Sequence, residues 1–235
     1  MSIKTIPQFE TTRTPRERIP PLANGDHLSL WEFEQRYAAM PEKVIAELVE
    51  GVVYMSSPVT LDHGNPHALI ITWLGVYSAT CMQIEIADNT SVRLDLDNEV
   101  QPDALLRFKK QSGGQSGETK ARFVQGAPEL VVEVAVSSAS FDLHEKMNVY
   151  RRNGVMEYIV WQVLSERLDW FRLREGKYER VEPDAQGMIR SEVFPGLWLA
   201  VDKLLNGDLA GVLAELQKGI ATPEHAAFVA KLATQ

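Results

Sequence analysis

Apolar side chains in the first third of the chain follow helical spacing in some segments and strand-like runs in others. Residues 29–41 carry apolar positions at helical spacing, and their opening Ser-Leu-Trp-Glu has the spacing of a capping box, which predicts a helix. Residues 44–55 form two apolar runs around Glu50-Gly51, a pattern typical of a β-hairpin. Asn65-Pro66 then predicts the start of a second helix, apolar enough to be packed on two sides, that extends to residue 81.

The rest of the chain reads mainly as strands separated by turns. The apolar runs predict strands at residues 83–87, 91–96, 104–109, 130–136, 157–163, 167–173 and 178–181. Ser140 can cap a helix that stops at Gly154, and residues 201–216 predict a last helix. The Gly- and Ser-rich residues 111–117 predict a flexible surface loop.

Strands and helices intermingle without an internal repeat or an obvious linker, which predicts one α/β domain with an extension at each end. The domain is expected to span residues 28–207. Residues 1–27, rich in Pro and Thr, are expected to form an extended arm, and residues 208–235 the end of a helix and a loosely attached tail. A composition of 45% hydrophobic and 24% charged residues is ordinary for a chain with a sizeable core.

Charge and cysteine content exclude several kinds of protein. A net charge of −8 argues against a broad basic surface for non-specific nucleic-acid binding, although a small basic cleft or metal ions can serve that purpose locally. The single cysteine, Cys81, permits neither an internal disulfide nor a cysteine-based zinc site. Because no signal peptide and no run of about 18 apolar residues is seen, we expect a cytoplasmic protein that does not enter a membrane.

Glu133 is the residue that first suggests chemistry. It is the one polar residue in the apolar run 130–136, which has the pattern of a central strand buried on both faces. A carboxylate there is costly unless something compensates its charge. Two interpretations follow: a glutamate at the end of the strand that forms a salt bridge or reaches solvent, or a metal ligand or catalytic carboxylate.

Three further residues bear on Glu133. Asp103 follows Pro102 at the start of a predicted strand, although Pro-Asp pairs are also common in turns. Glu47 interrupts the first apolar run of the hairpin, where a solvent-facing position is the simpler interpretation. Lys146 shares a predicted helical stripe with apolar Leu143, Met147 and Tyr150, so its ammonium should point toward the sheet or lie along it.

Two histidines near the second helix are weaker candidates. His63 and His67 lie four residues apart, a spacing that places both on one helical face. They could contact substrate or act as accessory ligands. A structural or solvent-exposed role is the favoured interpretation, because the segment lacks the HExxH pattern of a zinc site.

Taken together, these residues resemble the PD-(D/E)XK nuclease signature, and more specifically the Uma-type family of bacterial endonucleases. The resemblance spans about residues 28–205 and rests on Glu47-Leu48-Val49-Glu50-Gly51, Gln101-Pro102-Asp103, Ala127-Pro128-Glu129-Leu130-Val131-Val132-Glu133-Val134, Lys146 with Tyr150, Gly154-Val155-Met156-Glu157-Tyr158 and Pro195-Gly196-Leu197. Ala135 stands where the superfamily signature has its lysine, and Lys146 takes that place in the Uma-type pattern. In place of the Ser-Pro-Ser-Thr that often follows the strand, this chain has Val136-Ser137-Ser138-Ala139-Ser140.

The resemblance implies a restriction-endonuclease-like fold, with a mixed central β-sheet flanked by helices. It implies a metal-dependent nuclease acting on DNA, with Mg²⁺ or Mn²⁺ held by Asp103, Glu133, Glu47 and the carbonyl of Val134. Lys146 would act on the attacking water. A non-catalytic protein-binding module on the same fold and a hydrolase of other phosphoesters are the alternatives. The oligomeric state stays open, with a homodimer among the options.

Overall fold

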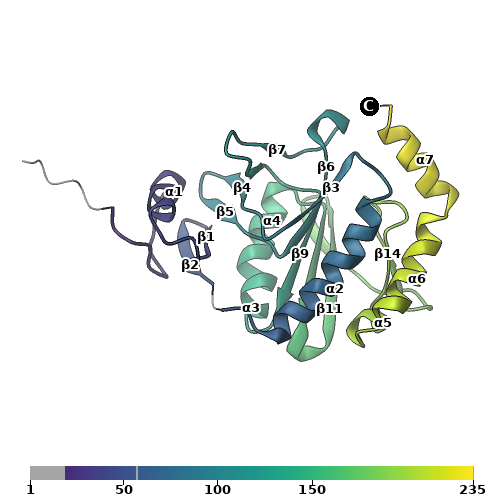
Figure 1. Cartoon of the computed structure of the whole chain (residues 1–235). Helices are drawn as coiled ribbons and strands as arrows, with labels where there is room; N and C mark the ends of the chain where they lie inside the picture. The colour runs from purple at the N-terminus through teal and green to yellow at the C-terminus, as the bar shows by residue number, and fades with distance from the viewer. Residues whose placement is uncertain (1–18, 57, 235) are drawn as a thin grey trace, which may run out of the picture.

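The computed structural model describes residues 19–56 and 58–234 and is built around a mixed six-stranded sheet (Figure 1). Its strand order is β12-β11-β10-β9-β6-β3, in which β9 and β10 are parallel and the other neighbours antiparallel. The strands are β3 (Ile84–Asp88), β6 (Ala104–Phe108), β9 (Leu130–Ala135), β10 (Glu157–Gln162), β11 (Arg167–Arg174) and β12 (Lys177–Val181). Every residue of β9 is buried, as expected for a strand in the interior of the sheet.

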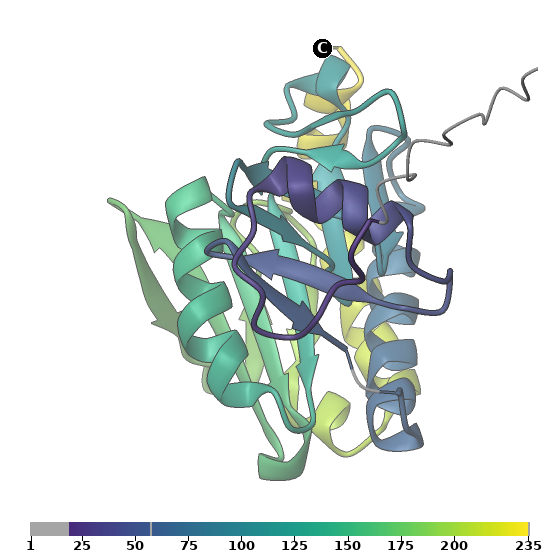
Figure 2. The same cartoon turned by 90° about the vertical axis from the view of Figure 1, so that its left-hand side faces the viewer.

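A second six-stranded sheet, in the order β2-β1-β5-β4-β8-β7, lies over one face of the central sheet. Its strands are β1 (Ala46–Val49), β2 (Val52–Met55), β4 (Val92–Asp95), β5 (Asn98–Val100), β7 (Gly117–Glu118) and β8 (Val124–Gln125). Figure 2 shows the β1–β2 hairpin and helix α1 (Leu30–Ala38) in front of the central sheet. A short pair, β13 (Met188–Arg190) and β14 (Trp198–Ala200), forms a third sheet.

Helices cover both faces of the central sheet (Figures 1 and 2). One face packs against α2 (Leu61–Ser78), α5 (Val201–Leu205), α6 (Leu209–Ile220) and α7 (Pro223–Leu232). The other face carries α3 (Ala139–Phe141), a π-helical turn over Asp142–Lys146 and α4 (Met147–Asn153). Short 3₁₀ turns lie at Lys110–Ser112 and Val163–Ser165. This architecture is the predicted mixed α/β fold. Within the described ranges, no helix is both long and apolar enough to cross a membrane.

Most predicted elements are present, but several boundaries were wrong. Helix α2 begins at Leu61 rather than at Asn65, because the Gly64 amide already donates to the carbonyl of Thr60 at 2.9 Å. The extra turn brings His63 into the helix. The expected helix over 201–216 is split into α5 and α6 at Asn206-Gly207, where Gly207 has a positive φ of 72°.

Two segments expected to be loose are packed instead. The 111–117 loop folds against the sheet, because the buried Glu129 carboxylate accepts hydrogen bonds from the amides of Gln115 and Phe108, each at 2.9 Å. The expected C-terminal tail contains α7, in which His225 and Leu232 are buried. Most of the expected N-terminal arm lies outside the described residues.

Candidate functional site

Glu133 and Asp103 project from the same face of the central sheet. Side chains alternate between faces along a strand, so Glu133 shares its face with its buried neighbours Val131 and Ala135. Strand β6 pairs with β9 through Ala104 opposite Val132, and Asp103 immediately precedes this pair. The two carboxylates therefore stand on neighbouring strands, on the face covered by the second sheet and α4.

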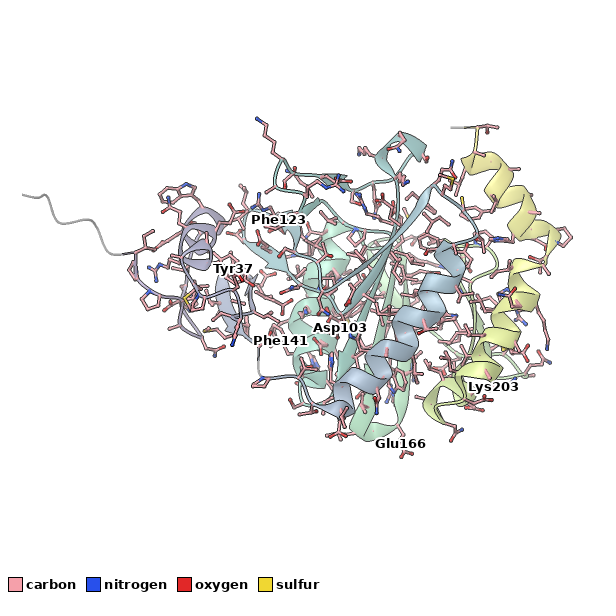
Figure 3. All side chains as sticks on the ribbon, in the orientation of Figure 1. Tyr37, Asp103, Phe123, Phe141, Glu166 and Lys203 are labelled. Atoms are coloured by element: carbon pink, nitrogen blue, oxygen red, sulfur yellow. The ribbon has the colours of Figure 1, made fainter. Side chains whose placement is uncertain are left out.

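Asp103 is held by groups from two elements. Its Oδ2 accepts a hydrogen bond of 2.6 Å from the backbone amide of Val134, which lies beyond the last paired residues of β6 and β9. Its Oδ1 lies 3.0 Å from Nε2 of His63, and its carbonyl oxygen 2.8 Å from Nε2 of His67. The His67 nitrogen is also 3.0 Å from Oδ1 of Asp88. In Figure 3 the labelled Asp103 lies in the middle of the molecule.

Glu47 reaches the same region from the second sheet. Strand β1 is buried throughout, and Oε1 of Glu47 accepts a hydrogen bond of 2.6 Å from the backbone amide of Gln101. The same oxygen lies 2.9 Å from the ammonium of Lys146. The expectation of a solvent-facing strand position does not hold, because Glu47 is 9% exposed.

Lys146 connects the two glutamates. Its ammonium lies 2.7 Å from Oε1 of Glu133 as well as 2.9 Å from Oε1 of Glu47, and the side chain is only 4% exposed. Lys146 ends the π-helical turn, at whose start the carbonyl of Asp142 accepts a 2.9 Å hydrogen bond from the hydroxyl of Tyr158. A side-chain donor inserted in this way widens a helix locally, and such turns are frequent at functional sites.

The buried face of this helical segment differs from the predicted stripe. Asp142, Lys146, Val149 and Tyr150 are buried, whereas Leu143 and Met147 are only partly buried. The buried face includes Lys146 because its ammonium pairs with Glu47 and Glu133. The helix also begins after Ser138, two residues before the expected cap.

Asp142 and Tyr150 are the two residues of the site that sequence reasoning missed in this role. The Tyr150 hydroxyl donates a 2.7 Å hydrogen bond to Oε1 of Glu133. The Asp142 carboxylate accepts a 2.6 Å hydrogen bond from the hydroxyl of Ser138 and is buried. The spacing of Asp142, Lys146 and Tyr150, each four residues apart, is the signal that would have identified them as one helical face.

The electrostatics of the site reflect an excess of acids. Four carboxyl groups (Glu47, Asp103, Glu133 and Asp142) surround Lys146 and His63. Burial raises the pKa of Glu133 well above its usual value, although the charge of Lys146 opposes this. Burial also disfavours the charged form of Lys146, but the carboxylates of Glu133 and Glu47 outweigh it and raise the lysine pKa.

The pKa of Asp103 shifts in the opposite direction, because two hydrogen-bond donors contact its carboxylate. Burial would raise its pKa, but the hydrogen bonds from His63 and the Val134 amide hold the pKa below the ordinary value. The same hydrogen bond raises the pKa of His63, which favours the charged imidazolium beside a charged carboxylate. Asp103 is thus kept ionised, as a metal ligand must be.

The oxygen donors of the site suit a hard divalent cation, but they are not arranged around one common point. Carboxylate oxygens and a backbone carbonyl are what Mg²⁺ and Mn²⁺ prefer. The N–H and C=O of a strand residue point to the same side, so the Val134 carbonyl is directed to the β6 side of β9, as its amide is. Within the part of the chain that the structure describes, however, no three His, Cys, Asp or Glu side chains form a metal-binding group. The Lys146 ammonium instead occupies the space between Glu47 and Glu133.

The structure brings together all four side chains that the sequence suggested. Asp103, Glu133, Glu47 and Lys146 meet between the central sheet, the second sheet and the π-helical turn. The two histidines also lie against Asp103, so neither is merely solvent-exposed. The catalytic and ligand roles of these residues stay predictions.

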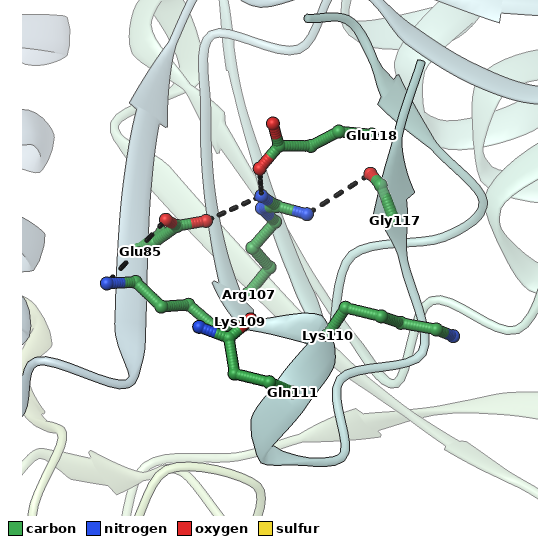
Figure 4. Close-up of a pocket in the computed structure, with 7 residues that line it drawn as sticks. All are labelled: Glu85, Arg107, Lys109, Lys110, Gln111, Gly117 and Glu118. Atoms are coloured by element: carbon green, nitrogen blue, oxygen red, sulfur yellow. Dashed lines mark hydrogen bonds and ion pairs between the residues drawn. The ribbon is translucent and has the colours of Figure 1, made fainter. Parts of the chain in front are cut away.

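A cavity of about 480 Å³ lies away from this cluster, at the opposite end of β3 and β6 (Figure 4). There Arg107 bonds to Glu85 at 2.6 Å and to Glu118 at 2.7 Å, which fastens β7 to the central sheet. Because both carboxylates already engage the guanidinium, we assign this group a structural role.

Comparisons with known proteins agree with the architecture. The model of the Uma2 family, described as "Putative restriction endonuclease", matches residues 31–202. A crystal structure described as a putative nuclease belonging to DUF820, from Anabaena variabilis, is similar with a TM-score of 0.57 and 12% identity, over 74% of this chain and 97% of that one. At this identity the likeness concerns the fold alone. No curated protein matches the chain. Since the family model covers well over half of the sequence, the chain belongs to the Uma2 family of putative restriction endonucleases.

Proposed function

We propose that the protein is a nuclease that hydrolyses phosphodiester bonds in DNA and depends on Mg²⁺ or Mn²⁺. The observation that carries this proposal is the meeting of Asp103, Glu133, Glu47 and Lys146 at one place, from four separate segments of the chain. A fold needs no such group of buried charges for stability, since apolar residues of similar volume are often as good. The family supports the same class of reaction.

Each residue has a task in this reaction. Asp103, Glu133, Glu47 and the Val134 carbonyl would hold the ion, and His63 and His67 would fix the position of Asp103. A bound divalent cation polarises the phosphodiester and stabilises charge on its oxygens. Lys146 would orient the attacking water and help to remove its proton. Tyr150 would keep Glu133 in place.

The first test measures cleavage and ion binding in parallel. Purified wild-type protein should cut supercoiled and linear DNA when Mg²⁺ or Mn²⁺ is added and stay inactive in EDTA. Asp103→Asn and Glu133→Gln should lose both cleavage and Mn²⁺ binding by calorimetry, because each removes an anionic ligand. Glu166→Gln, at an exposed turn marked in Figure 3, is the matched control and should behave like wild type. Unchanged Mn²⁺ affinity in both site variants would show that the ligand assignment is wrong.

A second test concerns Lys146. Lys146→Ala should lower the cleavage rate by about 10²–10⁴-fold, the loss typical of a positioned proton-transfer group. The variant should remain folded when Mg²⁺ is present, because the ion replaces the missing counter-charge of Glu47 and Glu133. Single-turnover rates with saturating DNA give the measurement. A variant that is folded and as fast as wild type excludes a role for Lys146 in the chemistry.

A second candidate function is a non-catalytic module that binds a protein partner. It is favoured by the internal pairing of Glu133 with Lys146 and Tyr150 and of Asp103 with His63, which gives both carboxylates hydrogen-bond partners without any ligand. The net charge of −8 also suits a protein partner better than DNA. A wild-type protein that neither binds Mn²⁺ nor cleaves DNA would favour this alternative.

A further inference from the structure

The ammonium of Lys146 occupies the position of a cation in the site. It bonds to one oxygen of Glu133 and one of Glu47, and the side chain is 4% exposed. These are two of the three carboxylates that the proposed function assigns to a divalent ion. The lysine therefore compensates, in the described structure, the same negative charge that the ion would compensate.

Two cations cannot share these oxygens without strong repulsion. A divalent ion takes lone pairs that now accept from the ammonium, and like charges at close range repel, especially in a buried site. Lys146 must therefore leave the Oε1 atoms of Glu47 and Glu133 when the ion binds to them. Because its side chain is buried, the ammonium then needs another carboxylate nearby.

Asp142 is placed to be that carboxylate. It begins the π-helical turn that Lys146 ends, it is 3% exposed, and the ligand set proposed above does not use it. Its carboxylate accepts one hydrogen bond from the neutral hydroxyl of Ser138, which does not compensate a buried charge. The charge of Asp142 also contributes to the raised pKa of Lys146, so the two side chains already belong to one electrostatic cluster.

We propose that Lys146 competes with the divalent ion for Glu47 and Glu133, and that Asp142 receives the ammonium when the ion displaces it. The inference rests on the proposed function, since it takes the ligand set from there. In this account Asp142 is a positioning residue, which acts through Lys146 and does not touch the ion.

Calorimetric titration of the full-length protein with Mn²⁺ alone tests both parts. Lys146→Gln, which keeps a hydrogen-bonding amide but no charge, should bind Mn²⁺ on the order of tenfold more tightly than wild type. Asp142→Asn should bind it on the order of tenfold more weakly, because the displaced ammonium lacks an anionic partner. In the Lys146→Gln background the Asp142→Asn change should have no effect on affinity. Glu145→Gln, on the exposed side of the same turn, is the control and should match wild type.

The outcomes separate the alternatives. If Asp142→Asn weakens Mn²⁺ binding equally with and without Lys146, Asp142 is a ligand and the acceptor role is overturned. If wild type binds Mn²⁺ and Lys146→Gln binds it no more tightly, the competition is overturned while the proposed function stands. If neither wild type nor Lys146→Gln binds Mn²⁺, the competition and the proposed function are both overturned. Lys146→Met, with circular dichroism recorded in excess Mn²⁺, provides a second uncharged variant should the glutamine protein fail to fold.

Discussion

Burial and hydrogen bonding act in opposite directions on the pKa values of the acids in this site. Asp103 accepts from His63 and from a backbone amide, and its pKa falls below the usual value even though burial opposes the charge. Glu133 accepts from Lys146 and Tyr150, yet burial raises its pKa. The two neighbouring carboxylates are therefore pushed apart in pKa, a situation often found where acid–base chemistry occurs.

The Tyr150 hydroxyl provides a prediction at this scale. Tyr150→Phe removes the 2.7 Å hydrogen bond to Glu133 and should lower the free energy of unfolding by about 1.5–3 kcal/mol, as for bonds to charged groups. Tyr178→Phe, which removes a 2.9 Å bond to the neutral carbonyl of Val155, is the matched control and should cost about 0.5–1.5 kcal/mol. Urea denaturation of both variants gives the comparison. Equal losses in the free energy of unfolding would show that the hydrogen bond to Glu133 stabilises the fold no more than the bond to a neutral carbonyl.

At the residue scale, the sequence reveals a site residue when its burial would carry a clear free-energy cost. Glu133, alone in a run of apolar residues, is conspicuous because an unpaired buried carboxylate is expensive. Asp142 is not conspicuous, because it lies in a segment of mixed polar and apolar residues and its burial depends on a π-helical turn that local patterns do not predict. Tyr150 was placed on the buried face, but its hydroxyl partner comes from a strand 17 residues away.

At the scale of elements, α1 is joined to the second sheet by a group that responds to pH. Arg93 on β4 lies 2.6 Å from Glu34 on α1 and 2.9 Å from Glu99 on β5. Glu99 is 4% exposed, and burial, with Glu34 as a further negative neighbour, raises its pKa to about 6. The folded state therefore binds a proton at Glu99 more tightly than the unfolded chain does.

Above pH 6 the folded protein must hold Glu99 ionised, which costs about 2 kcal/mol because burial raises the pKa of this group from 4.5 to about 6. The cost disappears as the pH falls from 6 to 4.5. Glu99→Gln should therefore be more stable than wild type at pH 7, and this advantage should vanish near pH 4. Urea denaturation across this range measures the difference, and a pH-independent difference would contradict the raised pKa.

Helix α7 gives a second prediction for an element. Its His225 lies 2.8 Å from the carbonyl of Pro195, and Phe228 packs 5.9 Å from the ring of Phe108. Removal of residues 222–235 should lower the free energy of unfolding by about 3 kcal/mol or more, since each fully buried apolar side chain contributes about 1.5–3 kcal/mol. Thermal unfolding of the truncated protein, with removal of Gln235 alone as control, tests this. An unchanged midpoint would restore the interpretation of this segment as a loose tail.

The elements predicted best are those whose pattern is local. The central strand, the β1–β2 hairpin and the cap at Ser29 follow from periodicity and turn residues. The β13–β14 pair was missed because its strands are three residues long and seven residues apart. Helix α2 was started too late because Pro66 resembles a first-turn residue, while Thr60 provides the actual N-cap.

The whole molecule combines a cluster of acids with an acidic surface. A net charge of −8 repels DNA, and nucleic-acid affinity depends largely on cations that neutralise phosphates. Four of the acidic residues in that balance, Glu47, Asp103, Glu133 and Asp142, lie within the candidate site. A divalent ion in the site would provide a local positive charge where the surface provides little.

DNA binding should accordingly depend on metal. In EDTA at physiological salt, the protein should bind a fluorescent duplex more weakly than typical non-specific binders do, with a dissociation constant above their range of roughly 10⁻⁴–10⁻⁶ M. Addition of Ca²⁺, which occupies oxygen sites, should tighten it in wild type and not in Asp103→Asn. Fluorescence anisotropy gives both values. Tight binding in EDTA with a steep salt dependence would reveal a basic surface that the charge balance does not suggest.

The central claim is that Asp103 and Glu133 hold a divalent ion, and the most direct measurement is anomalous X-ray scattering from crystals soaked in Mn²⁺. The account predicts an anomalous peak within about 2.5 Å of carboxylate oxygens of both residues, with the Lys146 ammonium no longer between Glu47 and Glu133. Mn²⁺ found only elsewhere at saturating concentration would contradict the claim. An ion bound to both carboxylates beside an intact lysine bridge would overturn only the displacement of Lys146.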